Sequence, residues 1–174
     1  FVQPVVAAGG GSLMVWAAMC WDAKSSIEFV ENVNGTVYLQ DIFQEVGIPF
    51  ARAVLGNQFI WMDDNAPPHR SRLVQNWMTE QAIVRLNWPA KSPDLNPIEN
   101  LWSQLSRAIH RRTPPPASLE ELRFAIADEW NRMPMWLVHN VVRSMPRRVQ
   151  AVSGRSNKDP MCEHCPSQDD LALK

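Results

Sequence analysis

The apolar positions in the first 62 residues predict three strands and one helix. Residues 12–20 form an almost uninterrupted apolar run of strand length, and residues 26–30 alternate as a strand with one wetter face does. These two segments are expected to pair as an antiparallel hairpin. Residues 58–62 are apolar on both faces, as in a buried parallel strand. A helical pattern over residues 35–55 separates the hairpin from that strand.

The helix boundaries carry recognisable signals. Polar residues stand at N-cap positions before three helical patterns: Asn34, Asn96 and Ser118. Gly47 and Pro49 are expected to interrupt the first helix. The remaining predicted elements are a helix over 70–81, a short strand over 83–86, helices that follow Asn96 and Ser118, and a final helical stretch over 136–152 with a stop or kink at Pro146.

This order of elements is that of an α/β chain whose C-terminal part is helical. Most tryptophans fall on apolar faces and are expected in the core, with Trp88 as a residue that could stack on a base: 16, 61, 77, 88, 102, 130 and 136. From residue 154 the chain turns polar and aperiodic, so 154–174 is expected to be a disordered tail after a single domain over 1–153.

Composition excludes several classes of protein. The chain has 174 residues, 45% hydrophobic and 20% charged, which is ordinary globular usage. Its longest apolar run has nine residues, from Leu13 to Trp21, which is too short to span a bilayer, and no signal peptide is recognisable. Three cysteines are too few for a disulfide framework. We therefore expect no membrane partner and an unsecreted protein.

The charge is unevenly distributed. The net charge is only −1, which argues against a wholly basic nucleic-acid binder. Residues 1–62 sum to −3, whereas residues 100–155 sum to +5. An arginine-rich helical surface can hold phosphates, although a solvated helix face with acidic partners such as Asp128 and Glu129 is the simpler interpretation.

Two carboxylates occupy positions suited to chemistry. Asp64 comes just after a predicted buried strand, and Glu99 lies in the first turn of the helix that follows Asn96. Taken singly, Asp64 could close an Asx-turn and Glu99 could serve as a helix-capping carboxylate. Converging carboxylates bind hard cations such as Mg²⁺, and a pair of such ions can activate an attacking oxygen and stabilise a leaving one.

The strings around these residues resemble a known family. MDDNAPPHRS over 62–71 and WPAKSPDLNPIENLW over 88–102 are similar to the signature of mariner-superfamily DDE transposases, with 34 residues between Asp64 and Glu99. The strings GGGSLMVWAAM over 9–19 and MPRRVQAV over 145–152 also resemble that family. The resemblance implies a ribonuclease-H-like mixed sheet flanked by helices. It also implies hydrolysis of phosphodiesters at transposon ends and joining of the freed 3′-hydroxyl to target DNA.

Carried over residue by residue, the resemblance makes Asp64 the second and Glu99 the third metal-binding carboxylate of a catalytic triad, with Mg²⁺ or Mn²⁺ in a two-ion site. Asp63 precedes the Asp-Asn pair and is not the match. The first triad aspartate would stand on a central strand upstream of the glycine-rich turn, and none of the carboxylates before Asp63 is at that place. We therefore expect the 174-residue chain to be inactive as a nuclease, and marginally stable or rearranged without that strand.

DNA, at transposon ends and at target sites, is the expected partner, with a homodimer as a further one and the nucleus as the location in a eukaryote. The residues proposed to contact DNA are His69, Arg70, Lys91, Arg107, Arg111 and Arg112. His69 could instead bond local backbone at the start of a helix. The spacing of Cys162 and Cys165 is that of half a zinc site, but the tail offers no second pair, so we expect no zinc there.

Two functions from different classes remain open at this point. The first is the catalytic domain of a transposase. The alternative is a transposon-derived, non-catalytic module that binds DNA or protein through the +5 segment. A third possibility is a fragment that folds only with an additional N-terminal piece.

Overall fold

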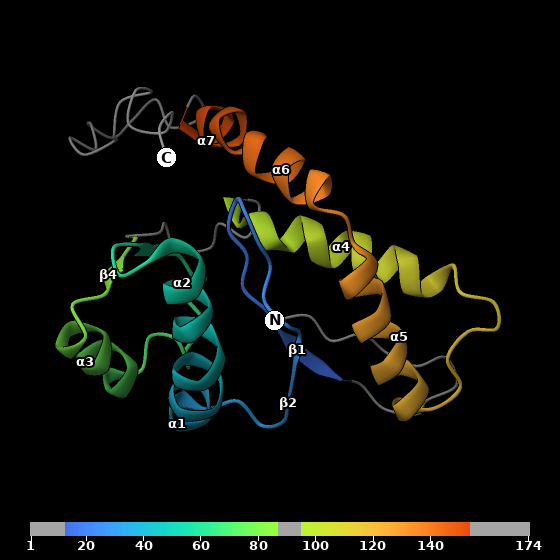
Figure 1. Ribbon diagram of the computed structural model, residues 1–174, viewed down its shortest axis with the longest axis horizontal. Coiled ribbons are helices and arrows are strands. Elements are labelled where there is room, and N and C mark those ends of the chain that lie inside the picture. The colour runs from blue at the N-terminus through green and yellow to red at the C-terminus, as the bar shows by residue number, and fades with distance from the viewer. Residues whose placement is uncertain (1–12, 87–94, 154–174) are drawn as a thin grey trace.

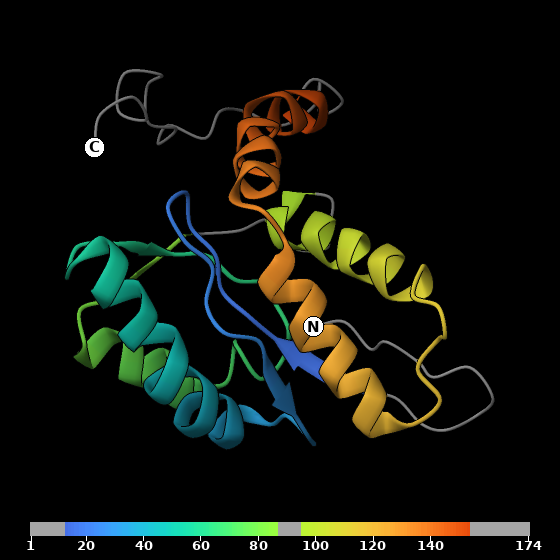
Figure 2. The same ribbon diagram turned by 45° about the vertical axis from the view of Figure 1, so that its right-hand side comes forward.

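The computed structural model describes residues 13–86 and 95–153, and a β-hairpin lies at its centre. Strands β1 (Met14–Trp16) and β2 (Glu28–Val30) are antiparallel, with Met14 opposite Val30, and a bridge between Met19 and Lys24 continues the pairing toward the turn. The predicted hairpin is therefore confirmed. Figures 1 and 2 show it between one group of helices, α1 to α3, and another, α4 and α5.

The apolar run that contains β1 supplies two hydrophobic cores because successive strand residues point to opposite faces. Val15 and Ala17 belong to the core on the side of α4 and α5, with Leu13 and Met19 packed against it. Trp16 belongs to the core on the other side, beneath α1 to α3. A run that is apolar on both faces is thus explained by a strand covered by helices on both sides.

The first helical segment runs without a break from residue 35 to 55. It comprises α1 (Gly35–Val37), a π-helix η1 (Tyr38–Gly47) and α2 (Ile48–Leu55). The predicted interruption at Gly47 and Pro49 is wrong. Pro49 has no N–H to donate to the preceding turn, and it stands where the π-helical segment η1 gives way to α2. Gly47 lies against the rings of Trp61 and Trp16, where a Cβ would approach to 3.0 and 3.2 Å.

A second, smaller sheet carries the segment that leads to Asp64. Strands β3 (Ile60–Trp61) and β4 (Val84–Arg85) are parallel, with Trp61 opposite Arg85, and α3 (Arg72–Glu80) connects them. The parallel pairing fits the expectation. Strand β3, however, is shorter than the strand predicted over residues 58–62, and it is not buried on both faces. Ile60 is 64% exposed because no element of the described residues covers that face.

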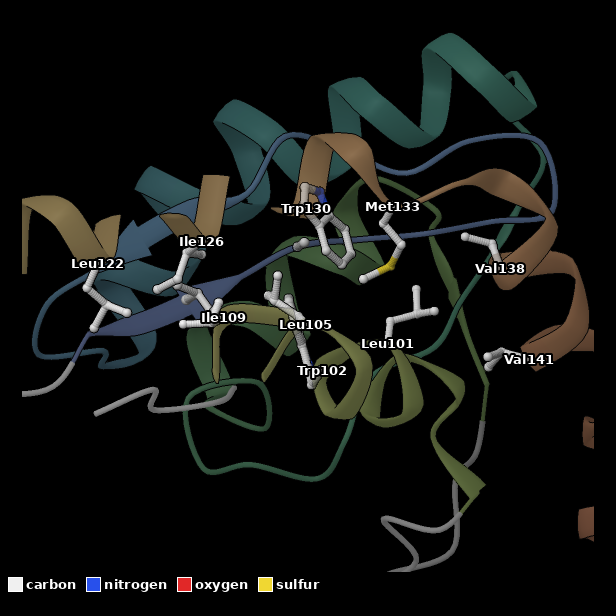
Figure 3. Packing of buried hydrophobic residues seen from close by; sticks show 12 residues of the cluster. Leu101, Trp102, Leu105, Ile109, Leu122, Ile126, Trp130, Met133, Val138 and Val141 are labelled. Atoms are coloured by element: carbon white, nitrogen blue, oxygen red, sulfur yellow. The ribbon is translucent and has the colours of Figure 1, made fainter. Parts of the chain in front are cut away.

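The C-terminal part is helical, as predicted, and packs around the core that contains Val15 and Ala17. It consists of α4 (Pro97–His110), α5 (Leu119–Arg132), α6 (Met135–Arg143) and α7 (Met145–Ser153). Figure 3 shows side chains from α4, α5 and α6 in one band with Trp130 near its middle, and the ring of Trp130 stacks on that of Trp102 with 5.2 Å between the ring centroids. The final stretch is two helices rather than one, with the break at Ser144 and Pro146 in the first turn of α7.

Local sequence signals explain where these helices begin. The side chains of the three predicted caps accept backbone N–H bonds in the first turn of their helices: Asn34, Asn96 and Ser118. Glu121 completes the last of these by accepting from the N–H of Ala117 at 2.8 Å. Trp136 is a correction to the predicted core, because it is 62% exposed on α6.

The described residues thus form an α/β fold with two separate two-stranded sheets. No helix among these residues has the length and apolar character needed to cross a membrane. The proposed tail over 154–174, Trp88, Lys91, Cys162 and Cys165 lie outside the described residues.

Candidate active site

Asp64 lies three residues after the end of β3, at the start of the loop that leads to α3. It lines a cavity of about 340 Å³ between the two sheets. One wall comes from residues 16–21 of the hairpin, a second from residues 59–64, and a third from the start of α4 at residues 96–98. The carboxyl end of a parallel strand and the N-terminus of a helix therefore meet at one cavity.

Two neighbours hold one oxygen of the Asp64 carboxylate. Nδ1 of His69 is 2.6 Å from Oδ1, and the N–H of Ala66 donates to the same oxygen at 3.0 Å. Burial alone would raise the pKa of Asp64, but the hydrogen bond and charge of His69 and the Ala66 N–H lower it to about 2. Asp64 is therefore ionised at neutral pH, as a cation ligand must be.

Glu99 lies in the first turn of α4, two residues after Pro97, which lines the same cavity. Burial raises the pKa of Glu99, and the negative charge of Asp64 raises it further. The two predicted carboxylates are thus close enough to repel one another. A nearby cation would relieve that repulsion and favour the ionised form of Glu99.

These donors fit a hard divalent cation, because both are carboxylates and one is held ionised and partly exposed beside a cavity. Within residues 13–86 and 95–153, however, no group of three or more histidine, cysteine or acidic side chains is gathered in a way that could hold a metal. Of the three carboxylates that the family resemblance implies, the described residues contain matches for two, Asp64 and Glu99.

Sequence reasoning missed a buried ion pair behind Asp64. Arg85 on β4 places Nη2 3.1 Å from Oδ2 of Asp63, and the two side chains are only 11% and 6% exposed. Burial raises the pKa of Asp63, and the charge of Arg85 opposes that rise. The sequence does place an acid, Asp63, directly after one predicted strand and a base, Arg85, within the next. It does not show the register of the two strands, so it does not show that these side chains meet.

The proposed DNA contacts are placed differently from one another. His69 is 4% exposed and engaged with Asp64, a placement that does not favour phosphate binding. Arg70 donates from Nε to Oδ1 of Asn65 at 2.6 Å. Arg112 pairs with Asp128 and Glu129 at 2.9 and 2.7 Å, as the simpler interpretation of the basic segment expects.

Arg107 and Arg111, in contrast, are exposed at the C-terminal end of α4. Arg111 also lines a second, open cavity together with Arg112 and Arg132. Among the members of the proposed set that lie in the described residues, these two arginines are the ones whose position leaves them accessible to a phosphate backbone.

Comparison with protein families decides the ancestry of this site. A family model described as DDE superfamily endonuclease matches residues 6–123, which include both Asp64 and Glu99. The chain belongs to the DDE superfamily of endonucleases. This family membership confirms the resemblance inferred from the motifs around the two carboxylates.

Relatives of this DDE superfamily member include transposases. The chain is 35% identical over 151 residues to the transposase of transposable element Tc1 from Caenorhabditis elegans, a match that covers 86% of this chain and 54% of the relative. The chain therefore spans about half the length of that relative.

Solved structures of the Mos1 transposase share the fold. The Mos1 catalytic domain with Raltegravir and Mg matches with a TM-score of 0.76 and 19% identity, over 92% of this chain and 82% of that one. The Mos1 paired-end complex with the left transposon end matches with a TM-score of 0.70 and 21% identity, over 91% and 47%. The ribonuclease-H-like fold class expected for this DDE domain is thereby confirmed.

Proposed function

We propose that this chain is part of the catalytic domain of a DNA transposase, with Asp64 and Glu99 as two of its metal-binding carboxylates. The observation that carries the proposal is geometric: Asp64, in the loop after β3, lines one cavity together with residues 96–98 at the start of α4, directly before Glu99. The family match over both residues supports it.

Asp64 and Glu99 are the residues that would hold Mg²⁺ or Mn²⁺, as a two-ion site with a further carboxylate. Bound there, the ions would activate an oxygen nucleophile and stabilise the leaving oxygen of a phosphodiester. The chain's own contribution is to keep the Asp64 carboxylate ionised and oriented through His69 and Ala66. The start of α4 adds a helix N-terminus, whose N–H groups favour anionic groups nearby.

The same proposal covers the partners. Mos1 forms a paired-end complex with a left transposon end, and we expect this chain to act on transposon-end and target DNA as well, as a homodimer that brings two ends together. The Tc1 relative comes from a nematode, which is a eukaryote, so we expect this chain to act in the nucleus.

We further propose that the 174-residue chain alone is inactive and that an added strand ending in aspartate would complete the site. The cavity between the two sheets supports this view. The buried indole N–H of Trp102, which lines the cavity, finds no acceptor among the described residues. An extended segment between the sheets would bring backbone carbonyl groups to that place.

The test compares two proteins, the 174-residue chain and a chain extended at its N-terminus by such a strand, in a Mn²⁺-dependent assay of DNA oligonucleotide cleavage. We expect cleavage only by the extended chain, with loss in Asp64→Asn and Glu99→Gln. The matched control is Asp41→Asn, since Asp41 is an exposed acid on η1. Cleavage by the 174-residue chain that Asp64→Asn abolishes would overturn the proposed inactivity.

A second candidate is a non-catalytic DNA-binding module, which the exposed Arg107 and Arg111 favour. Its signature is salt-sensitive DNA binding together with no cleavage by the extended chain and no thermal stabilisation by Mg²⁺ or Mn²⁺. That combination of results would exclude the catalytic proposal.

A further inference from the structure

One guanidinium closes the loop that carries Asp64. Nη2 of Arg85 contacts the carboxylate of Asp63 at 3.1 Å and also donates to the backbone carbonyl of His69 at 3.0 Å. Asp63 stands directly before Asp64, and His69 stands five residues after it. The buried arginine therefore ties together both ends of the segment that holds the proposed metal ligand.

His69 in turn reaches back to Asp64. Its Nδ1 lies 2.6 Å from Oδ1, and its ring packs against the buried ring of Tyr38 at a centroid distance of 4.2 Å. Because Tyr38 backs the imidazole and Arg85 holds the carbonyl of the same residue, His69 has little freedom to rotate. Its contact with Asp64 is thus fixed from two directions.

Stability alone does not account for the buried pair. Removing two charges from water is costly, so a buried ion pair is often no more stabilising than apolar residues of the same volume. An apolar pair, however, could not bond the His69 carbonyl. The contact specific to Arg85 is the one that sets the position of His69.

We propose that Asp63 and Arg85 are positioning residues that hold Asp64 in one orientation through His69. The functional part of this inference rests on the proposed role of Asp64 as a metal ligand. Groups that orient a ligand from behind commonly change metal affinity by about 10- to 100-fold when they are removed. The pair would therefore act on the site without touching the metal or the DNA.

The experiment uses NMR of the ¹⁵N-labelled 174-residue chain at fixed pH. The hydrogen-exchange protection of the Ala66 amide reports on its bond to Asp64, and the imidazole nitrogen shifts of His69 report on the contact of Nδ1 with the carboxylate. In the double variant Asp63→Leu/Arg85→Met we expect the protection of Ala66 to fall at least ten-fold and the His69 signature to be lost, while the amide of Leu105 in α4 stays protected.

Arg85→Lys serves as a second variant in case the double variant does not fold. Lysine can keep the charge opposite Asp63 but lacks the planar fork, so we expect an intermediate loss at Ala66. The matched control is Arg112→Met, which removes an ion-paired arginine from the other half of the fold and is expected to leave both signals unchanged. Wild-type signals at Ala66 and His69 in the two Arg85 variants would overturn the proposal.

Line broadening by Mn²⁺ separates this inference from the proposed function. Broadening at Asp64 and Glu99 that weakens about ten-fold in the double variant supports both. Intact Ala66 and His69 signals without broadening, both in the 174-residue chain and in the chain extended by the added strand, would overturn the metal-binding role and support the positioning geometry alone.

Discussion

The pKa of Asp64 offers a quantitative test of the site. His69 is replaced by alanine, which removes the hydrogen bond and charge that hold the pKa of Asp64 at about 2, against an ordinary value of 3.8. Burial then remains as the dominant influence, so the pKa of Asp64 in the variant should rise above 3.8. His69→Asn, which keeps an N–H near the position of Nδ1, should give an intermediate value.

The sign of the effect on stability follows from the direction of the shift. The folded-state pKa of Asp64 lies below its unfolded value, so the carboxylate stabilises the fold above about pH 3.8, and this contribution is lost as the pH falls through about 2. A shift of this size corresponds to at most about 2.4 kcal/mol. Because the side chain is 38% exposed, solvent screening reduces the expected contribution to about 1 kcal/mol.

The assay is a ¹³C titration of the Asp64 carboxyl group, paired with urea unfolding at several pH values between 2 and 5. The wild-type chain should lose about 1 kcal/mol of unfolding free energy through this group over that range, whereas His69→Ala should not. Lost packing against Tyr38 lowers the stability of the variant at every pH and so does not mimic the effect. If Asp64 still titrates near 2 in His69→Ala, the assigned cause is wrong.

Three further substitutions test the fold and the second carboxylate. Trp130→Phe removes a buried hydrogen bond from the indole N–H to the carbonyl of Ser25 (2.8 Å) and leaves a void. Urea unfolding should show that the free energy of unfolding falls by about 2–3 kcal/mol. Unchanged stability would contradict the structural role of Trp130. Gly47→Ala places a Cβ 3.0 Å from the Trp61 ring. The cost of overpacking, about 1–3 kcal/mol, should exceed the helix-propensity benefit of about 1 kcal/mol and lower the Tm. A higher Tm would show that the Trp61 ring moves aside. The pKa of Glu99 is raised, so its ionised form is disfavoured in the folded state at neutral pH. Glu99→Gln should therefore raise the Tm at pH 7 more than at pH 4. A lower Tm of this variant at pH 7 would refute the reasoning.

Sequence patterns predicted the elements that local chemistry determines. Asn34, Asn96 and Ser118 cap helices where expected, because a short polar side chain before an apolar periodic segment satisfies the first N–H groups regardless of the rest of the fold. The hairpin was equally accessible, since its strands are adjacent in the sequence. Such elements depend on few distant contacts.

Elements that depend on distant contacts were predicted less well. Gly47 and Pro49 indicated a helix break, but Gly47 is accommodated by indole rings from two strands, and Pro49 falls at a helical junction that only the π-helical register of η1 creates. Trp136 follows the apolar pattern of α6 and is nevertheless exposed. The spacing of apolar residues along the chain reveals neither the register of the backbone hydrogen bonds nor which element covers a given face.

The site shows the same division. Asp64 and Glu99 were identified from motif residues at element ends, and the structure brings their charges together. The support behind them was not identified, because the pairing of Asp63 with Arg85 depends on the register of β4 beside β3. Parallel strands joined by a helix do not reveal that register in their sequences.

Exposure and pairing together predict which arginines contribute to DNA binding. Arg107 and Arg111 are exposed, whereas the charge of Arg112 is opposed by two carboxylates. Each phosphate contact contributes about 0.9 to the slope of log affinity against log salt concentration. The double variant Arg107→Ala/Arg111→Ala should therefore reduce that slope by about 2, measured by fluorescence anisotropy with a labelled duplex between 50 and 200 mM salt.

Arg112→Ala should change the slope by less than either exposed arginine does, because Asp128 and Glu129 already neutralise the charge of Arg112 and leave little of it to bind phosphate. Arg52→Ala is the matched control, since Arg52 is an exposed arginine on α2, in the other group of helices. Equal slopes for Arg112→Ala and the double variant would show that net charge, rather than accessible arginines on α4, governs binding. An effect of Arg52→Ala as large as that of the double variant would instead place the DNA path on the opposite side of the hairpin.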